Sequence, residues 1–333
     1  MRRRLAKTAL AIAVGPVLAL VVWAAVRQRA PRPRPDRREI LAQEHAGPSP
    51  LGPRATEGIP ALLKAAAQGD TAAIRRLLSG GALVNERDKD GWTALHWASD
   101  AGQLEAVRLL LREGADAKAA AYDVDRFPTD VLSPGLSERR YKRSTRTPLH
   151  AALVRGHLTV AQALIDHGVE VNGRGVWGMT PLHFAANCAP PEAVELLLER
   201  GADINTRDDH GWTALHWAVQ DSNAESAGIL LKRGADPNCR SSKSFVMWGV
   251  THWSRREYPD GVTPLHVATR GLEMRGMPGR RYDVTPEQIA TVHVLLAEGA
   301  DPSVKDDSGA TPRDYAKRFW SSSALADLLE GHP

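Results

Sequence analysis

The sequence predicts an all-α solenoid of about seven helix-turn-helix repeats with hairpin-like turns, preceded by one N-terminal transmembrane helix. Two recurring motifs and one apolar run lead to this fold class. A tetrapeptide Thr-Pro/Ala-Leu-His occurs five times, and a tripeptide of the Gly-Ala-Asp type recurs behind it. Residues 8–26 carry no charged side chain and are rich in Ala, Val and Leu. We therefore expect the 333 residues to form an anchor, a tether and a repeat array rather than two globular domains.

The spacing of the two motifs defines one structural unit. The tetrapeptides begin at Thr93, Thr147, Thr180, Thr213 and Thr263, and the tripeptides begin at Gly114, Gly168, Gly201, Gly234 and Gly299. Each of the first four threonines precedes its glycine by 21 residues. Thr is a good N-cap, Pro suits the first position of a helix, and Gly ends a helix in the left-handed conformation. A second helix lies between them, with one apolar stripe made by Leu104, Val107, Leu110 and Leu111. One such unit cannot bury its apolar face alone, so neighbouring units must stack.

On these motifs the chain resembles the ankyrin repeat family, whose 33-residue unit carries Thr-Pro-Leu-His-x-Ala. Thr180 and Thr213 lie 33 residues apart, and the resemblance covers roughly residues 57–333. Residues 61–90 look like a first, capping repeat, and the segment that begins at Thr311 looks like the last one. The resemblance implies a structural role for the histidine of each tetrapeptide, which hydrogen-bonds the neighbouring turn. These histidines are His96, His150, His183, His216 and His266.

Three insertions interrupt the array, near residues 121–144, 241–260 and 270–287. The first two fall in the turn that becomes a hairpin in ankyrin repeats, and the third lies between the two helices of one repeat. Each contains an arginine pair with a nearby tyrosine: Arg139, Arg140 and Tyr141; Arg255, Arg256 and Tyr258; Arg280, Arg281 and Tyr282. Because arginine and rigid aromatic side chains dominate protein interfaces, these loops are predicted to be recognition surface. The other interpretation, that the aromatic side chains pack back on the solenoid, stays open.

The positions that face the concave groove in ankyrin proteins supply a second set of candidate partner contacts. Trp92 and Trp212 occupy the turn position of this groove, in Gly-Trp-Thr. The other groove candidates are Lys89, Asp100, Arg146, Arg155, Met179, Asn187, Asp209, Gln220 and Asp221. Their mixed charges fit a protein partner better than a phosphate backbone. Trp97 and Trp217, which directly follow the repeat histidine, are expected to serve packing.

The sequence offers no motif for catalysis or for a bound metal ion. It contains no HExxH, no Cys/His spacing suited to zinc, no Gly-x-Ser-x-Gly and no phosphate-binding glycine loop. Cys188 and Cys239 lie 51 residues apart and fit neither a CxxC motif nor a nucleophile motif. We therefore expect no enzyme activity, no cofactor, no metal and no small-molecule substrate.

The basic charge of the chain belongs to its N-terminal arm. Residues 1–40 hold ten Lys/Arg and two Asp/Glu, a net charge of +8, so the whole-chain value of +4 leaves −4 for the other 293 residues. A body of this charge disfavours nucleic-acid binding. We interpret residues 1–7 as a basic N-terminus, 8–26 as a transmembrane helix or signal anchor, and 27–56 as a Pro/Arg-rich tether to the repeat domain, 57–333. As a helix, the 19-residue run spans about 28 Å, close to the ~30 Å hydrocarbon core of a bilayer.

The leading functional hypothesis is a protein-binding scaffold, with a partner not yet identified, held at a membrane as a single-pass protein. Six arginines follow the apolar run and four Lys/Arg precede it, which leans towards a cytoplasmic body, although a periplasmic one stays open. One alternative is an exported periplasmic or secreted factor. Another is a module that binds polyanions or anionic lipid through the Arg-Arg-Tyr insertions. The excess of Arg over Lys, 34 to 9, indicates a GC-rich, bacterial genome.

Overall fold

The computed structural model describes residues 60–122, 145–242, 245–248, 254–270, 273–274, 284–320 and 323–330. The chain divides into two units, Met1–Ala55 and Thr56–Pro333, and every described residue belongs to the second. The predicted transmembrane helix, residues 8–26, lies outside the described residues. Among the residues that are described, no helix combines the length and the apolar character needed to cross a membrane.

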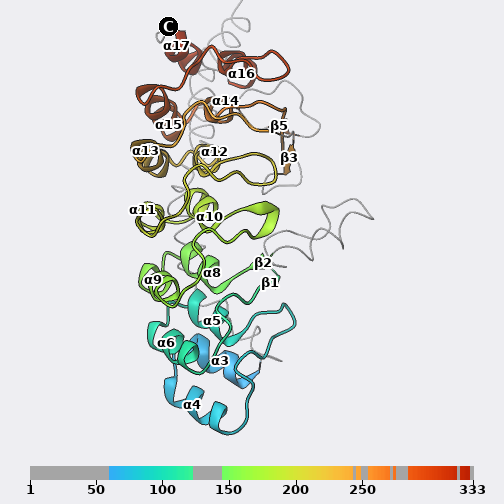
Figure 1. Cartoon of the computed structure of the whole chain (residues 1–333). Helices are drawn as coiled ribbons and strands as arrows, with labels where there is room; N and C mark the ends of the chain where they lie inside the picture. The colour runs from blue at the N-terminus through green and yellow to red at the C-terminus, as the bar shows by residue number, and fades with distance from the viewer. Residues whose placement is uncertain are drawn as a thin grey trace, which may run out of the picture. The chain divides into compact units, whose positions relative to one another are not determined.

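Helix pairs repeat along the described part of the second unit, as Figure 1 shows. We number the seven pairs found there as repeats 1 to 7 and assign to each repeat the turn that precedes its first helix. The pairs are α3 (Ala61–Gln68) and α4 (Thr71–Ser79), α5 (Ala94–Asp100) and α6 (Leu104–Arg112), α8 (Pro148–Val154) and α9 (Leu158–Asp166), α10 (Pro181–Cys188) and α11 (Pro191–Glu199), α12 (Ala214–Gln220) and α13 (Ala224–Lys232), α14 (Pro264–Thr269) and α15 (Pro286–Ala297), and α16 (Pro312–Phe319) and α17 (Ala324–Glu330). The expectation of stacked helix pairs is confirmed.

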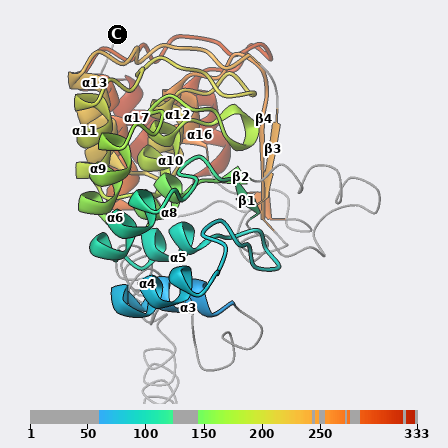
Figure 2. The same ribbon diagram turned by 60° about the horizontal axis from the view of Figure 1, so that its bottom comes forward.

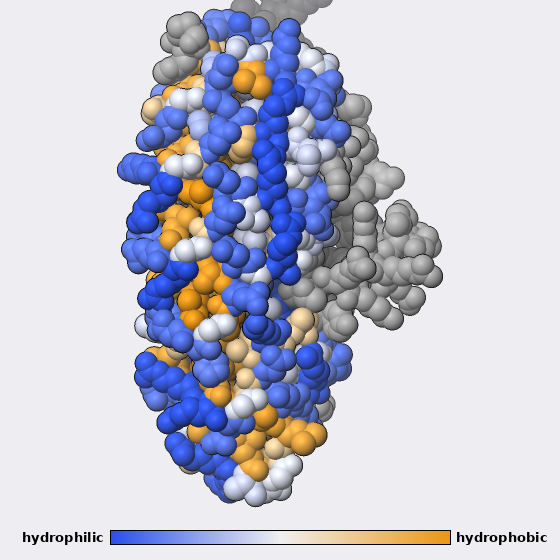
Figure 3. All heavy atoms as spheres, viewed as in Figure 1, coloured by the Kyte–Doolittle hydropathy of each residue, from blue (hydrophilic) through white to orange (hydrophobic). Residues whose placement is uncertain are grey.

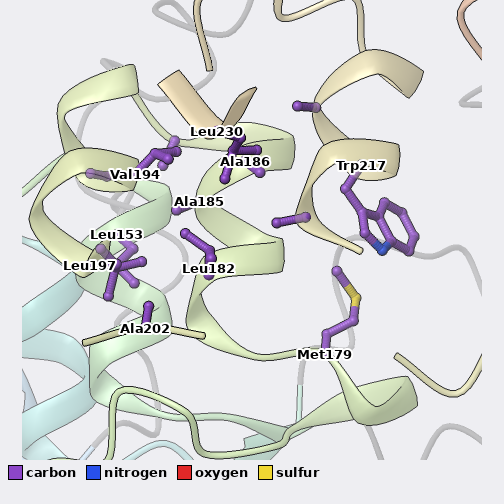
Figure 4. Packing of buried hydrophobic residues seen from close by; sticks show 14 of the residues in the cluster. Leu153, Met179, Leu182, Ala185, Ala186, Val194, Leu197, Ala202, Trp217 and Leu230 are labelled. Atoms are coloured by element: carbon purple, nitrogen blue, oxygen red, sulfur yellow. The ribbon is translucent and has the colours of Figure 1, made fainter. Parts of the chain in front are cut away.

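The helices of the stack form two rows. Each first helix contacts the first helices of the adjacent repeats, and the second helices from α4 to α15 do the same. In Figures 1 and 2 the row of first helices lies between the row of second helices and the strands. The hydrophobic core fills the space between the rows. In Figure 4, Leu153 of α8, Leu182 of α10, Leu197 of α11 and Leu230 of α13 converge there, and all four are fully buried or nearly so.

Local sequence explains where the first helices begin and where the second ones end. In repeats 2 to 6 the Thr of the tetrapeptide is the N-cap of the first helix, and the His at the third helical position completes a capping box with it. Behind the second helices, Gly114 has a φ of +84°, a left-handed conformation that suits glycine best. The chain can therefore reverse there and enter the turn of the next repeat.

Short strands form where the insertions leave the array. β1 (Ala121–Tyr122) pairs with β2 (Thr145–Arg146), antiparallel, on either side of the first insertion. β3 (Phe245–Trp248), β4 (Ser254–Tyr258) and β5 (Glu273–Met274) form one antiparallel sheet in the order β3-β4-β5. Because β5 lies between α14 and α15, the second and third insertions share this sheet.

Candidate protein-interaction surface

The five repeat histidines hold the turns in place rather than face a ligand. In each, Nδ1 accepts from the backbone N–H of the preceding Thr, at 3.0 to 3.3 Å, so Nε2 carries the proton. Four of them donate this N–H to a carbonyl in the turn of the next repeat: His96 to Arg146 (3.0 Å), His183 to Trp212 (3.1 Å), His216 to Val262 (3.2 Å) and His266 to Ala310 (3.0 Å). The Nε2 atom of His150 is buried and has no hydrogen-bond partner among the described residues.

Burial keeps these imidazoles neutral. Loss of solvation lowers the pKa of His96 to about 4 and the pKa of His216 to about 3, although the carbonyl bond of each acts in the opposite direction. Loss of solvation also lowers the pKa of His150 to about 3, with the charge of Arg146 as a further cause. A neutral imidazole that donates one hydrogen bond and accepts another is a structural element. It is not poised for acid–base chemistry near neutral pH.

An aspartate in the turn organises repeats 2, 5 and 7 in the same way. One carboxylate oxygen of Asp88, Asp208 and Asp306 accepts from two backbone N–H groups of its own turn, at 2.8 to 3.0 Å. The other oxygen accepts from a side chain of the first helix: Trp97 Nε1 (2.9 Å), Trp217 Nε1 (2.9 Å) or Tyr315 OH (2.6 Å). The side chains of Trp97 and Trp217 thus connect the first helix to the turn of the same repeat, in agreement with the packing role expected for them.

Repeats 3, 4 and 6 lack both the turn aspartate and the donor on the first helix. Repeat 4 has Gly175 at the position of the turn aspartate. Its first helix has Phe184, which lacks a hydrogen-bond donor, at the position of the tryptophan. Repeats 3 and 6, whose turns hold the first two insertions, have Ala151 and Val267 at this helix position. A donor buried without its acceptor would destabilise the fold, which explains the matched pairs.

The structure corrects the sequence prediction for Trp212, Met179 and Tyr258, which lie in the core. Trp212 is 0% exposed because Tyr258 of the second insertion and Trp217 pack edge-on against its ring, with centroids 5.0 and 5.2 Å away. Met179 is buried, and Figure 4 shows it extending towards Trp217. Trp92, in the same Gly-Trp-Thr context as Trp212, stays half-buried against His96 and Trp97. For Tyr258, therefore, the alternative of packing back on the solenoid is the correct one.

Four of the predicted groove residues form two pairs across neighbouring repeats. Arg155 Nε donates to Asp100 Oδ1 at 2.9 Å in a largely buried ion pair between repeats 3 and 2. Asp100 is only 6% exposed, so it holds Arg155 rather than offering a contact of its own. Asn187 Nδ2 donates to Asp221 Oδ2 at 3.0 Å between repeats 4 and 5. These pairs bring the ends of the first helices together along one row.

The other predicted site residues are dispersed. Gln220 ends α12 half-buried, Arg146 is half-buried on β2, and Lys89 is exposed in the turn of repeat 2. Asp209 is exposed and pairs with Arg174 at 3.4 Å. Arg255 and Arg256 lie on β4. The predicted contacts Arg139, Arg140, Tyr141, Arg280, Arg281 and Tyr282 fall outside the described residues.

Trp177, in the turn of repeat 4, is a surface residue that the sequence analysis passed over. Its side chain is 44% exposed, and its backbone is left-handed, with φ +53° and ψ +25°. The equivalent turn residues of repeats 2, 5 and 7 are Asp90, His210 and Ser308, whose N–H groups the turn aspartate holds. Alignment of the turns on their shared Thr would have revealed a tryptophan at a position that is otherwise polar.

A buried arginine, Arg270, lies at the end of α14, where the third insertion begins. The guanidinium of Arg270 lies over the rings of Tyr258, Tyr315 and Phe319, 5.4, 5.2 and 4.9 Å from their centroids. Cation–π attraction is strongest where water is excluded, as it is here. This contact ties the end of α14 to α16 and to the end of β4.

No group of three or more His, Cys, Asp or Glu side chains suited to a metal ion occurs in the part of the chain that the structure describes. Burial raises the pKa of the Cys239 thiol to about 11, although the Thr213 hydroxyl opposes this shift, so the thiol stays protonated.

Comparisons with known proteins match this architecture. A family model described as ankyrin repeats matches residues 38–121, 132–208 and 177–241. Protein phosphatase 1 regulatory subunit 27 of Mus musculus is 36% identical over 81 residues, which are 24% of this chain and 52% of that protein. Protein VAPYRIN-LIKE of Medicago truncatula is 47% identical over 49 residues, 15% of this chain and 11% of that protein. The chain spans about half the length of the first of these relatives and less of the second.

Among solved structures, the human ASB11 ankyrin repeat domain is similar to this chain with a TM-score of 0.57 and 22% sequence identity. The match covers 83% of this chain and all of that domain. At this level of identity, the likeness concerns the fold alone.

Proposed function

Because the chain belongs to the ankyrin repeat family, we propose that it is a non-catalytic scaffold that binds a partner protein through its first-helix row and its turns. Proteins of this family are scaffolds whose surface side chains decide what they bind. One similar protein is, by its name, a regulatory subunit of a phosphatase, which fits a binding role.

Trp177 is the observation that carries this proposal. Leu83 and Trp177 are the two large apolar side chains that the described residues expose, and Trp177 is the larger. A left-handed backbone costs a non-glycine residue free energy, and such outliers cluster where binding uses them. Tryptophan is also one of the three residue types enriched among the side chains that dominate protein interfaces. We assign to Trp177 the role of an anchor for the partner.

The paired groove residues support the same surface. Because Arg155 is held by Asp100, and Asp221 by Asn187, their side chains are ordered before a partner arrives. Ordered side chains lose less conformational entropy on binding, so the same contacts give a higher affinity. The mixed charge of this row fits a partner with both acidic and basic side chains.

We also propose that residues 8–26 hold the scaffold in a membrane, with the body in the cytoplasm. The uncharged run and the basic residues on both its sides support this. A reporter fused after Pro333 tests the side of the membrane. Mass measurement of the N-terminus in cells distinguishes this proposal from export, because a chain that starts near Ala25 would mean that the run is removed as a signal.

Site-specific photo-crosslinking tests the binding surface. A photoreactive phenylalanine derivative replaces Trp177 in one variant of the full chain and Glu195, an exposed residue of the second-helix row, in a matched control. We expect a protein adduct from position 177 in cells that make the protein, and none of the same mass from position 195. Equal adducts at both positions, or an adduct only at 195, would reject the proposed surface. An adduct with nucleic acid would favour the polyanion alternative.

A further inference from the structure

Consecutive repeats are tied by hydrogen bonds of three kinds, and the first kind is the histidine bond. We call the contact between two consecutive repeats a joint. The histidine bond is present at the joints between repeats 2 and 3, 4 and 5, 5 and 6, and 6 and 7. At the joint between repeats 3 and 4 the corresponding donor is Nε2 of His150, which is buried without a partner in the described part of the chain. This joint therefore lacks a bond that its neighbours have, and it contains a buried donor that is not satisfied.

The second tie is an arginine that reaches the turn of the next repeat. The donors and acceptors are Arg87 to Ala120 O (2.6 Å), Arg174 to Arg207 O (2.9 Å), Arg207 to Arg240 O, and Arg240 to Asp307 Oδ1 (2.5 Å). At the joint between repeats 3 and 4 the equivalent residue is Ala120, which has no side-chain donor. Figure 3 shows a hydrophilic stripe that runs lengthwise over the C-terminal repeats.

The third tie is an asparagine that bridges two turns. Asn85, Asn172 and Asn238 each donate through Nδ2 to a glycine carbonyl of the next turn and accept at Oδ1, at 2.8 Å, from an aspartate N–H of that turn. At the joint between repeats 3 and 4 this residue is Lys118, which forms an ion pair with Glu170 at 2.6 Å. Both side chains of that pair are well exposed, so salt screens it.

We propose that the joint between repeats 3 and 4 divides the array into two units, repeats 1–3 and repeats 4–7, that open independently of each other. In a solenoid each repeat contacts only its neighbours, so the stability of the array is a sum of repeat terms and joint terms. Among the described joints between repeats 2 and 7, all three ties are absent at this joint only, and helix packing and two exposed ion pairs, Lys118–Glu170 and Arg200–Asp166, cross it. Such a joint lets the two halves of the binding surface change their mutual orientation while each half stays folded.

Hydrogen exchange of the full chain, followed by mass spectrometry of peptides, tests the proposal. Val107 of α6 and Val194 of α11 are fully buried at equivalent positions of repeats 2 and 4, and Val→Ala is mild enough to leave the chain folded. We expect Val107→Ala to lower amide protection about tenfold in repeats 1–3 and to leave repeats 5–7 unchanged. Val194→Ala should have the converse effect, with a loss across repeats 4–7 and none in repeats 1 and 2.

A loss of protection that spreads through all repeats from either variant overturns the proposal, and so does a boundary at any other joint. Restoring the ties gives a second test. Lys118→Asn together with Ala120→Arg rebuilds the asparagine and arginine positions of the other turns. In that background we expect Val107→Ala to lower protection in repeat 4 as well. If the boundary stays unchanged, the missing ties are not its cause, and the reasoning fails.

Discussion

Acid should destabilise this fold in a pH range where few carboxylates titrate, because buried neutral histidines hold it together. The folded-state pKa of His216 lies near 3, whereas its ordinary value is 6.5. Between these two pH values, therefore, the unfolded chain binds a proton at this histidine and the folded chain does not. Stability from this group is complete above pH 6.5 and falls as the pH drops from there towards 3.

The magnitude follows from the two pKa values. Between pH 7.5 and 5.5, one such histidine lowers the free energy of unfolding by about 1.4 kcal/mol. His96, with a pKa of about 4, and His150, with a pKa of about 3, add similar amounts, so the three together remove about 4 kcal/mol over this range. Burial also lowers the pKa of His183 and His266, which therefore act in the same direction. A loss of this size is a large share of the stability of an ordinary domain.

Urea unfolding, followed by tryptophan fluorescence and far-UV circular dichroism at pH 7.5 and 5.5, measures this loss. In His216→Gln we expect the loss between the two pH values to be about 1.4 kcal/mol smaller than in the parent, although the variant is less stable at pH 7.5. Glutamine can replace the capping interaction, as Gln288 does with the N–H of Thr285 at 3.0 Å. His167→Gln, at an exposed position, is the matched control and should keep the parent's pH dependence. A parent that is equally stable at both pH values, or a His216→Gln variant with the full loss, would refute the reasoning.

Further substitutions test the turns. In urea unfolding we expect Asp208→Ala to lower the free energy of unfolding by about 2–4 kcal/mol, because three donors lose their acceptor in the core. The equivalent Asp88→Ala, at a half-buried position, should lower it less, and equal losses would contradict this account. Gly178→Ala should lower the melting temperature more than Gly114→Ala does. Both residues have a positive φ, but only at Gly178 would an added Cβ overlap a neighbouring ion pair. A larger drop in melting temperature for Gly114→Ala would contradict this reasoning. Tyr315→Phe should cost about 1–2 kcal/mol by removing a 2.6 Å hydrogen bond to the turn carboxylate, and an unchanged urea midpoint would show that this bond is dispensable.

The repeated part of the fold could be predicted from the sequence because its determinants are local. Thr93 and His96 form a capping box within one helical turn, and Gly114 has the positive φ that its place behind a helix predicts. The stacking of the pairs follows from the same motifs, since each unit exposes an apolar face that only a neighbour can cover.

The candidate surface could be predicted less well, because burial depends on residues that are distant in the sequence. Trp92 and Trp212 lie in the same Gly-Trp-Thr tripeptide, but the ring of Tyr258, from an insertion, covers Trp212 alone. Trp177 became recognisable only against the equivalent turns, where an aspartate orders a polar residue. The Nε2 atom of His150, which has no partner in the described part of the chain, has no local sequence signature, since its own Thr-Pro-Leu-His is regular.

The claim that this chain binds a protein through the surface around Trp177 is tested most directly by an affinity. The dissociation constant of the crosslinked partner is measured for the full chain, for Trp177→Ala and for Leu83→Ala, the control at the other exposed apolar side chain. The account predicts binding about 30-fold weaker for Trp177→Ala, which corresponds to about 2 kcal/mol, and little change for Leu83→Ala, with all three proteins equally stable. Equal affinity of the parent and Trp177→Ala would contradict it.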